Sequence, residues 1–354
     1  MNVESLARSI IGDARVTMQE GGIINFNFRI DSVSDSSKSF FLTIYSSKDN
    51  WWKVKKNVRM GHLLEEAGVP TPKIIKYGLF DNEGKLEAFL LREYISGETY
   101  DSLMLSENKL GEMDWIRLLS SFGDNLARIH KIGFDSFGMV KGSNITNSPS
   151  NRISHSPNWI SFFDQLINER RGRLASIYPE MKIGNVNGTD IYTLFDSIME
   201  YYSIHRNSLL SVVQPYLTHN DLINTNLLAS KMNEDRNGWV LAGILDTEWS
   251  LAGDPDYDLI QIENWVQFAP YRNKFNNYFP YFINSYQQNR TISPDLEDKR
   301  GIYHIARSIS YLTSVFDYDY EVFASSRLHI HQVQEHLAFL QNVVRNNYEF
   351  KLFK

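Results

Sequence analysis

The sequence of 354 residues contains no cysteine. This absence excludes disulfide bonds, thiolate catalysis and cysteine-based zinc sites, and it is typical of proteins in a reducing compartment. No apolar run approaches the roughly 18 residues that a membrane span needs. The N-terminal segment carries Glu4 and Asp13 and lacks the apolar core of a signal peptide. We therefore expect a cytoplasmic protein with no membrane partner.

An excess of positive charge is also missing. Lysine and arginine number 36 against 42 aspartates and glutamates, which gives a formal net charge of -6. No basic field exists to attract phosphate backbones, so we expect no nucleic-acid partner, whereas a mildly acidic surface suits a cationic small molecule. Hydrophobic residues make up 42% of the chain and aromatic residues 13%, which is typical of a folded globular protein long enough for two lobes.

The first hundred residues predict a small sheet, and the rest of the chain predicts helices. Period-two alternation and turn residues indicate strands over 26–30, 40–45, 74–80 and 86–94, with one helix over 51–67 that Gly68 ends. Past Gly97 the spacing is mostly helical, interrupted by two short apolar stretches at 226–229 and 239–245. We predict an α+β protein with an N-terminal lobe over 1–96 and a larger helical lobe over 97–354.

One segment carries residues suited to phosphoryl transfer. Asp221 lies in an H-x-D pattern, Asn226 follows it by five residues, and Asp246 ends an apolar strand twenty residues later. A kinase needs a carboxylate that accepts the hydroxyl proton, and it needs an amide oxygen and a second carboxylate that hold Mg²⁺ on the phosphates. Two protein ligands are enough for Mg²⁺, because this ion keeps several of its waters. We predict Asp221 as the catalytic base and Asn226 and Asp246 as metal ligands.

The chain resembles the aminoglycoside phosphotransferase and choline kinase superfamily. His219 to Asn226 is similar to its catalytic loop, usually H-G-D-x-x-x-x-N, and Asp246-Thr247-Glu248 is similar to its metal segment. The stretches 253–259, 68–72 and 91–98 resemble its G-D-P-x-x-D-L tail, its G-V-P-x-P turn and its hinge, all in family order. This ordered set is more specific than any single motif. It implies a bilobal protein-kinase-like fold.

The resemblance further implies a small-molecule kinase that uses ATP or GTP with Mg²⁺. Nucleotide contacts are then expected from a loop, a strand and the hinge of the first lobe. The residues at these positions are Gly21, Gly22, Asn25, Thr43, Glu93 and Ile95.

Several neighbouring residues have structural explanations that we prefer. His219 is expected to pack and hydrogen-bond, and Asp258 with Gln261 matches a capping box that opens a helix. Glu248 either reaches the metal's surroundings or is solvated. Aspartates at 254 and 256 are typical of turns. The acidic cluster Asp317, Asp319 and Glu321 is either a wall for an amine or, as we favour, a solvated turn.

The sequence also departs from the family pattern. Thr43 occupies the strand position of the lysine that grips the α- and β-phosphates, and no acid lies at 57–59, where the helix glutamate that orients this lysine is expected. Lysines at 48, 53 and 55 are possible substitutes. Asn220 replaces a glycine, and Thr247 stands where an aromatic residue is common.

Three functional hypotheses follow. The first is a small-molecule kinase with a cationic acceptor, of aminoglycoside type as the leading choice. The second is a catalytically silent family member that serves as a binding or scaffold protein, because both members of the strand–helix ion pair are missing. The third is a metal-dependent hydrolase that uses His219, Asp221 and Asp246, for which the sequence offers too few further ligands.

Overall fold

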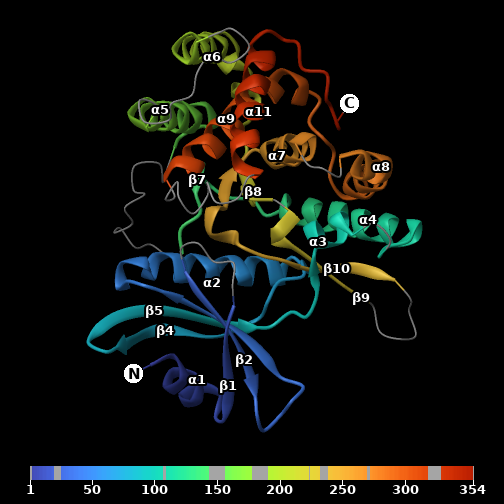
Figure 1. Cartoon of the computed structure of the whole chain (residues 1–354). Helices are drawn as coiled ribbons and strands as arrows, with labels where there is room; N and C mark the ends of the chain where they lie inside the picture. The colour runs from blue at the N-terminus through green and yellow to red at the C-terminus, as the bar shows by residue number, and fades with distance from the viewer. Residues whose placement is uncertain are drawn as a thin grey trace. The chain divides into compact units, whose positions relative to one another are not determined.

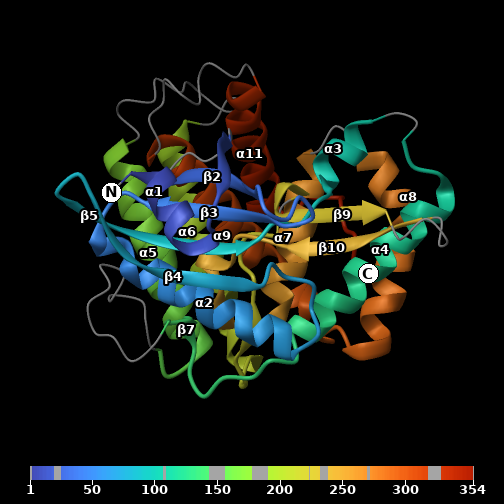
Figure 2. The same ribbon diagram turned by 90° about the horizontal axis from the view of Figure 1, so that it is seen from below.

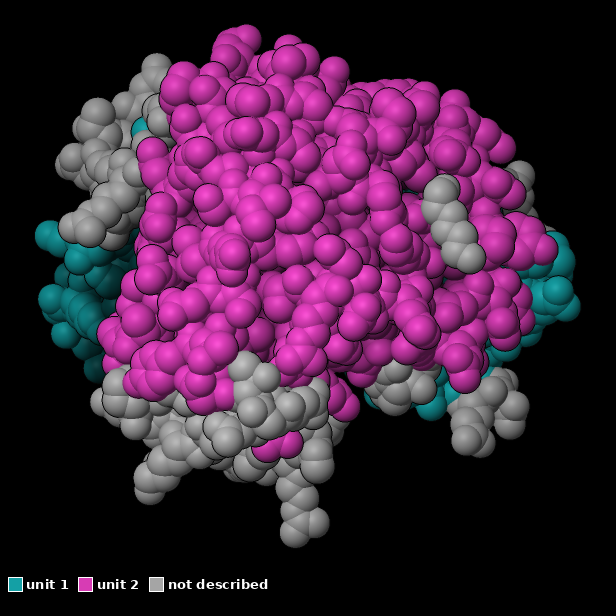
Figure 3. All heavy atoms as spheres, turned by 90° about the horizontal axis from the view of Figure 1, so that it is seen from above, with its two compact units in different colours: residues 1–129, 140–152, 224–249 teal, residues 130–139, 153–223, 250–354 magenta. Residues whose placement is uncertain are grey.

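The computed structural model describes most of the chain, in nine segments. They are residues 2–19, 25–106, 109–142, 156–177, 190–222, 224–231, 238–268, 272–317 and 328–353. The chain divides into two compact units, which Figure 3 colours separately. Unit 1 comprises residues 1–129, 140–152 and 224–249, and unit 2 comprises 130–139, 153–223 and 250–354. The lobe boundary between residues 96 and 97 stays a prediction.

Unit 1 contains a five-stranded antiparallel sheet of order β1-β2-β3-β5-β4, of which Figure 2 labels β2 to β5. Its strands are β1 (Ala14–Gln19), β2 (Phe26–Ser32), β3 (Ser39–Tyr45), β4 (Ile74–Asn82) and β5 (Lys85–Glu93). The four strands that alternation predicts are therefore present. The edge strand β1 was not predicted, although Ala14, Val16 and Met18 alternate with polar residues along it.

Two helices cover opposite faces of this sheet. Helix α1 (Val3–Ile11) packs Leu6 and Ala7 against one set of strand residues, which includes Leu42 and Leu91. Helix α2 (Trp51–Glu66) packs against the alternate set, which includes Tyr45 and Leu90. Because side chains alternate along a strand, position 43 faces α2. Gly68 follows this helix with φ +68°, the left-handed conformation that glycine favours, as the predicted stop requires.

The remainder of unit 1 joins a hairpin to two helices. Strand β6 (Glu98–Thr99) pairs with β9 (Leu227–Lys231), which in turn pairs with β10 (Trp239–Ile244). Helices α3 (Tyr100–Leu105) and α4 (Glu112–Ile129) pack against this small sheet. A Cβ atom on Gly97 would lie 2.5 Å from the Ala229 carbonyl oxygen, so only glycine fits where the chain enters β6.

Unit 2 is mainly helical (Figure 1). Its helices are α5 (Trp159–Ile177), α6 (Ile191–His205), α7 (Pro255–Phe268), α8 (Arg272–Asn289), α9 (Leu296–Asp317) and α11 (Leu328–Val344). A short sheet of order β7-β11-β8 lies among them, formed by β7 (Gly138–Met139), β8 (Tyr216–Thr218) and β11 (Leu251–Gly253). The aromatic residues Trp159, Phe162 and Phe163 at the start of α5 are buried.

Candidate active site

The predicted catalytic loop begins where β8 ends in unit 2. Thr218 is the last residue of β8, and it pairs with Leu251 of β11 in the antiparallel register. Its hydroxyl also donates a hydrogen bond to the Leu251 carbonyl oxygen at 3.3 Å. The strand thus fixes the point from which His219 and the following residues leave the sheet.

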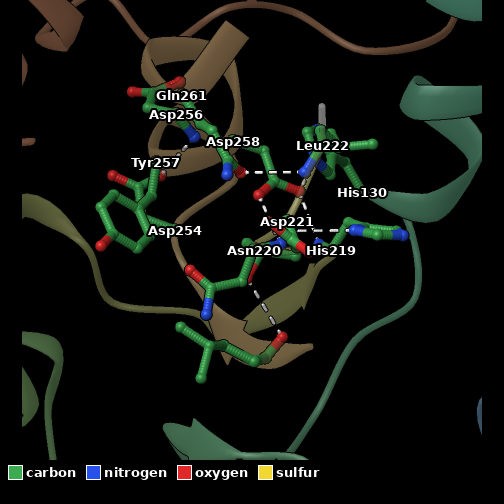
Figure 4. A network of polar contacts seen from close by, with 12 residues as sticks. His130, His219, Asn220, Asp221, Leu222, Asp254, Asp256, Tyr257, Asp258 and Gln261 are labelled. Atoms are coloured by element: carbon green, nitrogen blue, oxygen red, sulfur yellow. Dashed lines mark hydrogen bonds and ion pairs between the residues drawn. The ribbon is translucent and has the colours of Figure 1, made fainter. Parts of the chain in front are cut away.

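Side chains accept hydrogen bonds from four successive backbone N–H groups of this loop (Figure 4). Asp258 accepts from His219 and Asn220 at 2.6 and 2.8 Å, and Gln261 accepts from Leu222 at 3.1 Å. The Asp221 N–H donates to Nδ1 of the His219 imidazole at 3.3 Å. An irregular segment is rigid when its backbone groups are satisfied in this way, so helix α7 fixes the backbone that carries Asp221.

The capping box predicted from Asp258 and Gln261 is wrong. Helix α7 begins at Pro255, so Asp258 lies inside the helix and its carboxylate turns toward the loop. The local spacing matched a cap, but the N–H groups that these side chains accept belong to a segment almost forty residues earlier. Asp258 is nonetheless architectural, as the sequence analysis preferred.

The Asp258 carboxylate is fully buried and ionised. Burial opposes its ionisation, but the hydrogen bond from His130 Nε2 at 3.2 Å and the charge of Arg307 hold its pKa below the usual range. Burial also lowers the pKa of His130, so this imidazole is neutral. Its Nε2–H then donates to Asp258, and its Nδ1 accepts the Tyr286 hydroxyl at 2.8 Å.

Asn220, which replaces the glycine of the family pattern, adopts φ +63°. This left-handed conformation is open to glycine and, among other residues, best tolerated by asparagine. Arg307 also holds this residue, because its guanidinium donates to the Asn220 carbonyl oxygen at 3.0 Å and to Oδ1 at 2.7 Å. The departure from the pattern therefore preserves the backbone geometry of the loop.

Asp254 and Asp256 are buried ion-pair partners rather than exposed turn residues. Both carboxylates contact the ammonium group of Lys299 on α9, at 2.7 and 2.8 Å. Asp254 Oδ1 also accepts the Asp256 N–H at 3.1 Å, at the start of α7. These contacts anchor the first turn of the helix that holds the catalytic loop.

The two predicted metal ligands lie at one end of the β9–β10 hairpin in unit 1. Asn226 directly precedes β9, and Asp246 is the second residue after the end of β10. Ile244 pairs with Leu227, and the next N–H, from Leu245, donates to the Asn226 carbonyl oxygen at 2.9 Å. The hairpin register therefore brings the amide and the carboxylate to the same strand ends, and both supply the oxygen ligands that Mg²⁺ prefers.

The Asp246 carboxyl group has a perturbed pKa. More than a third of the residue is accessible to solvent, yet the protein atoms around the carboxyl group desolvate it and raise its pKa to about 6. The negative charge of Glu248 acts in the same direction, while Arg92 and Lys53 oppose it. A bound cation would favour the ionised form further, so the electrostatics fit a metal ligand.

Glu248 is buried and ion-paired, which rules out the solvated alternative. It is 7% exposed, and its Oε1 lies 3.5 Å from Nζ of Lys53 on α2. A second lysine of the same helix, Lys56, is also buried, and burial lowers its pKa to about 7 although Glu248 opposes this. Of the possible substitutes named from the sequence, Lys53 is thus the one that reaches the metal segment.

Uncharged groups occupy the positions of the family's strand–helix ion pair. Thr43 is 3% exposed on β3. Asn57, on the helix, donates to the Tyr45 hydroxyl at 3.2 Å and accepts the Thr247 hydroxyl at 3.3 Å. The nearest guanidinium, that of Arg92 on β5, donates to Thr43 Oγ1 at 3.2 Å. Arg92 was not predicted as a site residue, although its strand was predicted.

Comparison with known proteins identifies the family. The sequence matches the phosphotransferase enzyme family (APH) over residues 19–281, well over half of the chain. The chain belongs to this family. That result confirms the resemblance stated from the sequence and the predicted class of enzyme, a phosphotransferase.

Solved structures confirm the predicted fold. A thermostable mutant of the aminoglycoside phosphotransferase APH(4)-Ia, in a ternary complex with AMP-PNP and hygromycin B, is similar with a TM-score of 0.64 and 14% identity, over 98% of each chain. A second thermostable mutant of the same enzyme in the same complex gives 0.63 and 13%, over 97% of each chain. No protein of curated function matches the sequence.

The structure describes some of the residues that are predicted to contact the nucleotide. Gly21 and Gly22 lie outside the described residues, and Asn25 directly precedes β2. At the hinge, Glu93 ends β5, and its N–H donates to the Lys73 carbonyl oxygen at 2.8 Å. Ile95 follows two residues later, partly buried. The roles of these residues stay predictions.

Further predictions concern the acidic cluster, membrane spans and metal-binding groups. The side chains of the acidic cluster Asp317, Asp319 and Glu321 lie outside the described residues. Within the described segments, no helix is long and apolar enough to cross a membrane. In the same segments, no group of three or more His, Cys, Asp or Glu side chains is placed to hold a metal ion. The hydrolase hypothesis gains no support from that observation.

Proposed function

We propose that this phosphotransferase is a small-molecule kinase that transfers the γ-phosphate of ATP or GTP to a hydroxyl group of a small cationic acceptor. The observation that carries the proposal is the fixed loop around Asp221. Four successive N–H groups of this loop are held by side chains, two of them by Asp258. A positioned carboxylate of this kind is what a general base requires.

The proposed reaction assigns one step to Asp221. Its carboxylate accepts the proton of the acceptor hydroxyl while that oxygen forms a bond to the γ-phosphorus. The bond between the γ-phosphorus and the bridging oxygen breaks, and the nucleoside diphosphate leaves with that oxygen. Asn226 and Asp246 would hold Mg²⁺, whose charge would neutralise that of the phosphates. The hairpin that aligns both residues supports this assignment.

An aminoglycoside-type acceptor is the leading choice. The similar solved structures contain hygromycin B and the ATP analogue AMP-PNP, which supports an aminoglycoside and ATP for this chain. The net charge of -6 suits a polyamine better than an anionic acceptor. We propose ATP ahead of GTP on the same ground.

A catalytically silent binding protein is the second candidate. Thr43 and Asn57 favour it, because a strand lysine and its helix acid stabilise the transition state in active kinases. A kinase requires both nucleotide binding and transfer, whereas a silent binding or scaffold protein requires neither. A single preparation can therefore test both.

Purified protein should be mixed with Mg²⁺ and ATP or GTP, and its melting temperature recorded. A nucleotide at a hundredfold excess over its Kd stabilises the folded state by about 2.7 kcal/mol, so the melting temperature should rise. Absence of a shift with either nucleotide contradicts the kinase candidate and favours the silent one. Nucleotide-dependent phosphorylation should then be measured on a panel of aminoglycosides, amino alcohols and sugars.

Asp221→Asn separates binding from transfer. This variant should retain the thermal shift, whereas kcat should fall by about 10²- to 10⁴-fold because the base is lost. Asp196→Asn is the matched control, since Asp196 is exposed on α6, and its kcat should equal that of the wild type. A wild type that binds nucleotide but phosphorylates nothing on the panel would favour the silent candidate.

A further inference from the structure

Arg92 lies on the same face of the sheet as Thr43. In the register of β3 and β5, Thr43 pairs with Leu90, and Phe41 pairs with Arg92. Since side chains alternate along each strand, residues two positions apart project from one face. The hydrogen bond from Arg92 Nη2 to Thr43 Oγ1, at 3.2 Å, confirms the direction of the arginine side chain. Its guanidinium therefore lies beside residue 43, on the face of the sheet from which a lysine at that position would extend.

The charge of Arg92 is not matched by an ion pair. Among the described residues, no carboxylate lies within 4.0 Å of its guanidinium, in contrast to Arg29 of the same sheet, which contacts Asp31 at 2.8 Å. Its Nε atom is buried and has no hydrogen-bond acceptor in the described part of the chain. A buried donor without an acceptor destabilises the protein unless a ligand satisfies it.

The three lysines that the sequence offers as substitutes are placed differently from Arg92. Lys53 pairs with Glu248, and the Lys55 ammonium lies 5.4 Å from the Trp51 ring centroid. Lys48 is exposed on a short 3-10 helix.

We propose that Arg92 takes the role of the missing strand lysine and binds the phosphates of the nucleotide. This inference rests on the proposed function, because it assigns a residue to the same site. An arginine suits the task, since its guanidinium stays charged and presents several N–H donors to phosphate oxygens. Neighbouring strands are only about 4.8 Å apart, so a long side chain on β5 can serve a position on β3.

The test compares a nucleotide that has phosphates with one that has none. Binding of Mg²⁺·ADP and of adenosine should be measured by calorimetry for the wild type, Arg92→Met and Arg92→Lys. We expect Arg92→Met to weaken ADP binding about tenfold or more and adenosine binding less than about twofold, because only ADP presents phosphate oxygens. Arg92→Lys should fall between the wild type and Arg92→Met. Arg15→Met, at an exposed position on β1, is the matched control and should change neither affinity.

A second variant distinguishes phosphate binding from a structural role. Adding Thr43→Lys to Arg92→Met returns a cation to β3, and we expect it to recover most of the lost ADP affinity. Equal losses for ADP and adenosine, or no loss for ADP, would overturn the inference while leaving the proposed function intact. A wild type that binds neither ligand would overturn the proposed function and the inference together.

Discussion

The replacement of Asp258 by asparagine tests how the catalytic loop is held. The wild-type carboxylate accepts the N–H groups of His219 and Asn220 and the Nε2–H of His130, and its residue is fully buried. An asparagine has one acceptor oxygen and one NH₂ group. In Asp258→Asn the NH₂ group must face at least one N–H donor, so one backbone hydrogen bond is lost and the charge opposite Arg307 disappears.

The magnitude follows from these contacts. A buried N–H group left without an acceptor costs about 1–3 kcal/mol, and a hydrogen bond to a charged group contributes about 1.5–3 kcal/mol. Their sum is reduced because the neutral amide is easier to bury than the carboxylate, whose desolvation is the largest influence on its pKa. We expect a net loss of about 3 kcal/mol in the free energy of unfolding. Since domains are stable by about 5–15 kcal/mol, the variant should fold.

Urea unfolding at pH 7 and kcat are the two measurements. Asp258→Asn should lose both stability and turnover, while Asp196→Asn, exposed on α6, should stay within about 0.5 kcal/mol of the wild type. The folded-state pKa of Asp258 is lowered, so its stabilisation is complete above the unfolded pKa of about 3.9 and is lost as the pH falls through the folded pKa. The difference between variant and wild type should therefore be equal at pH 7 and pH 5. An Asp258→Asn protein as stable and active as the control would refute the reasoning.

Three further predictions use single residues. Asn220→Gly should be about 1–2 kcal/mol more stable than Asn220→Ala, because both lose the hydrogen bond from Arg307 to Oδ1 and only glycine adopts φ +63° without strain; equal stabilities in urea would contradict this. Gly97→Ala should lower the free energy of unfolding by about 1–3 kcal/mol, because its Cβ would meet the Ala229 carbonyl oxygen at 2.5 Å, and an unchanged urea midpoint would disprove it. Burial lowers the pKa of His336 to about 3, so the unfolded state gains a proton below about pH 6.5 that the folded state does not. The wild type should lose about 2 kcal/mol between pH 7 and pH 5 through this group, and His336→Gln should reduce the pH dependence by that amount.

Local patterns predicted much of the fold. Alternation over 26–30 and 40–45 matches β2 and β3, and the glycine at 68 ends α2 where expected. Strand β1 was missed although its apolar residues alternate with polar ones and Ala14 and Val16 pack against the core beside α1. Alanine is depleted in strands, so a run of six residues with one β-branched apolar residue is a weak strand signal.

Some residues of the candidate site could likewise be predicted from the sequence, and others could not. Asp221 could be predicted from the H-x-D pattern, and Asn226 and Asp246 from their spacing and from the two short apolar stretches that they adjoin. The role of Asp258 could not be predicted, since a carboxylate followed three residues later by glutamine matches a helix cap equally well. Arg92 was missed for a related reason. Its proximity to Thr43 depends on a strand register that joins residues 49 positions apart.

The two departures from the family pattern belong together in unit 1. A lysine at residue 43 needs an acid on α2 to orient it, and an acid there needs the lysine. In this chain α2 contributes the positive partner of an ion pair, Lys53, and the metal segment contributes the negative partner, Glu248. The helix therefore supplies a cation to its ion pair, whereas in the family pattern it supplies an acid. A carboxylate at position 57 would lie one helical turn from Lys53 and beside Thr247, where it would compete with Glu248 for the same ammonium group. The neutral Asn57 avoids this competition, and Arg92 supplies the positive charge from β5. Loss of the lysine and loss of the helix acid are therefore parts of one rearrangement, which retains cations beside Asp246 rather than removing them.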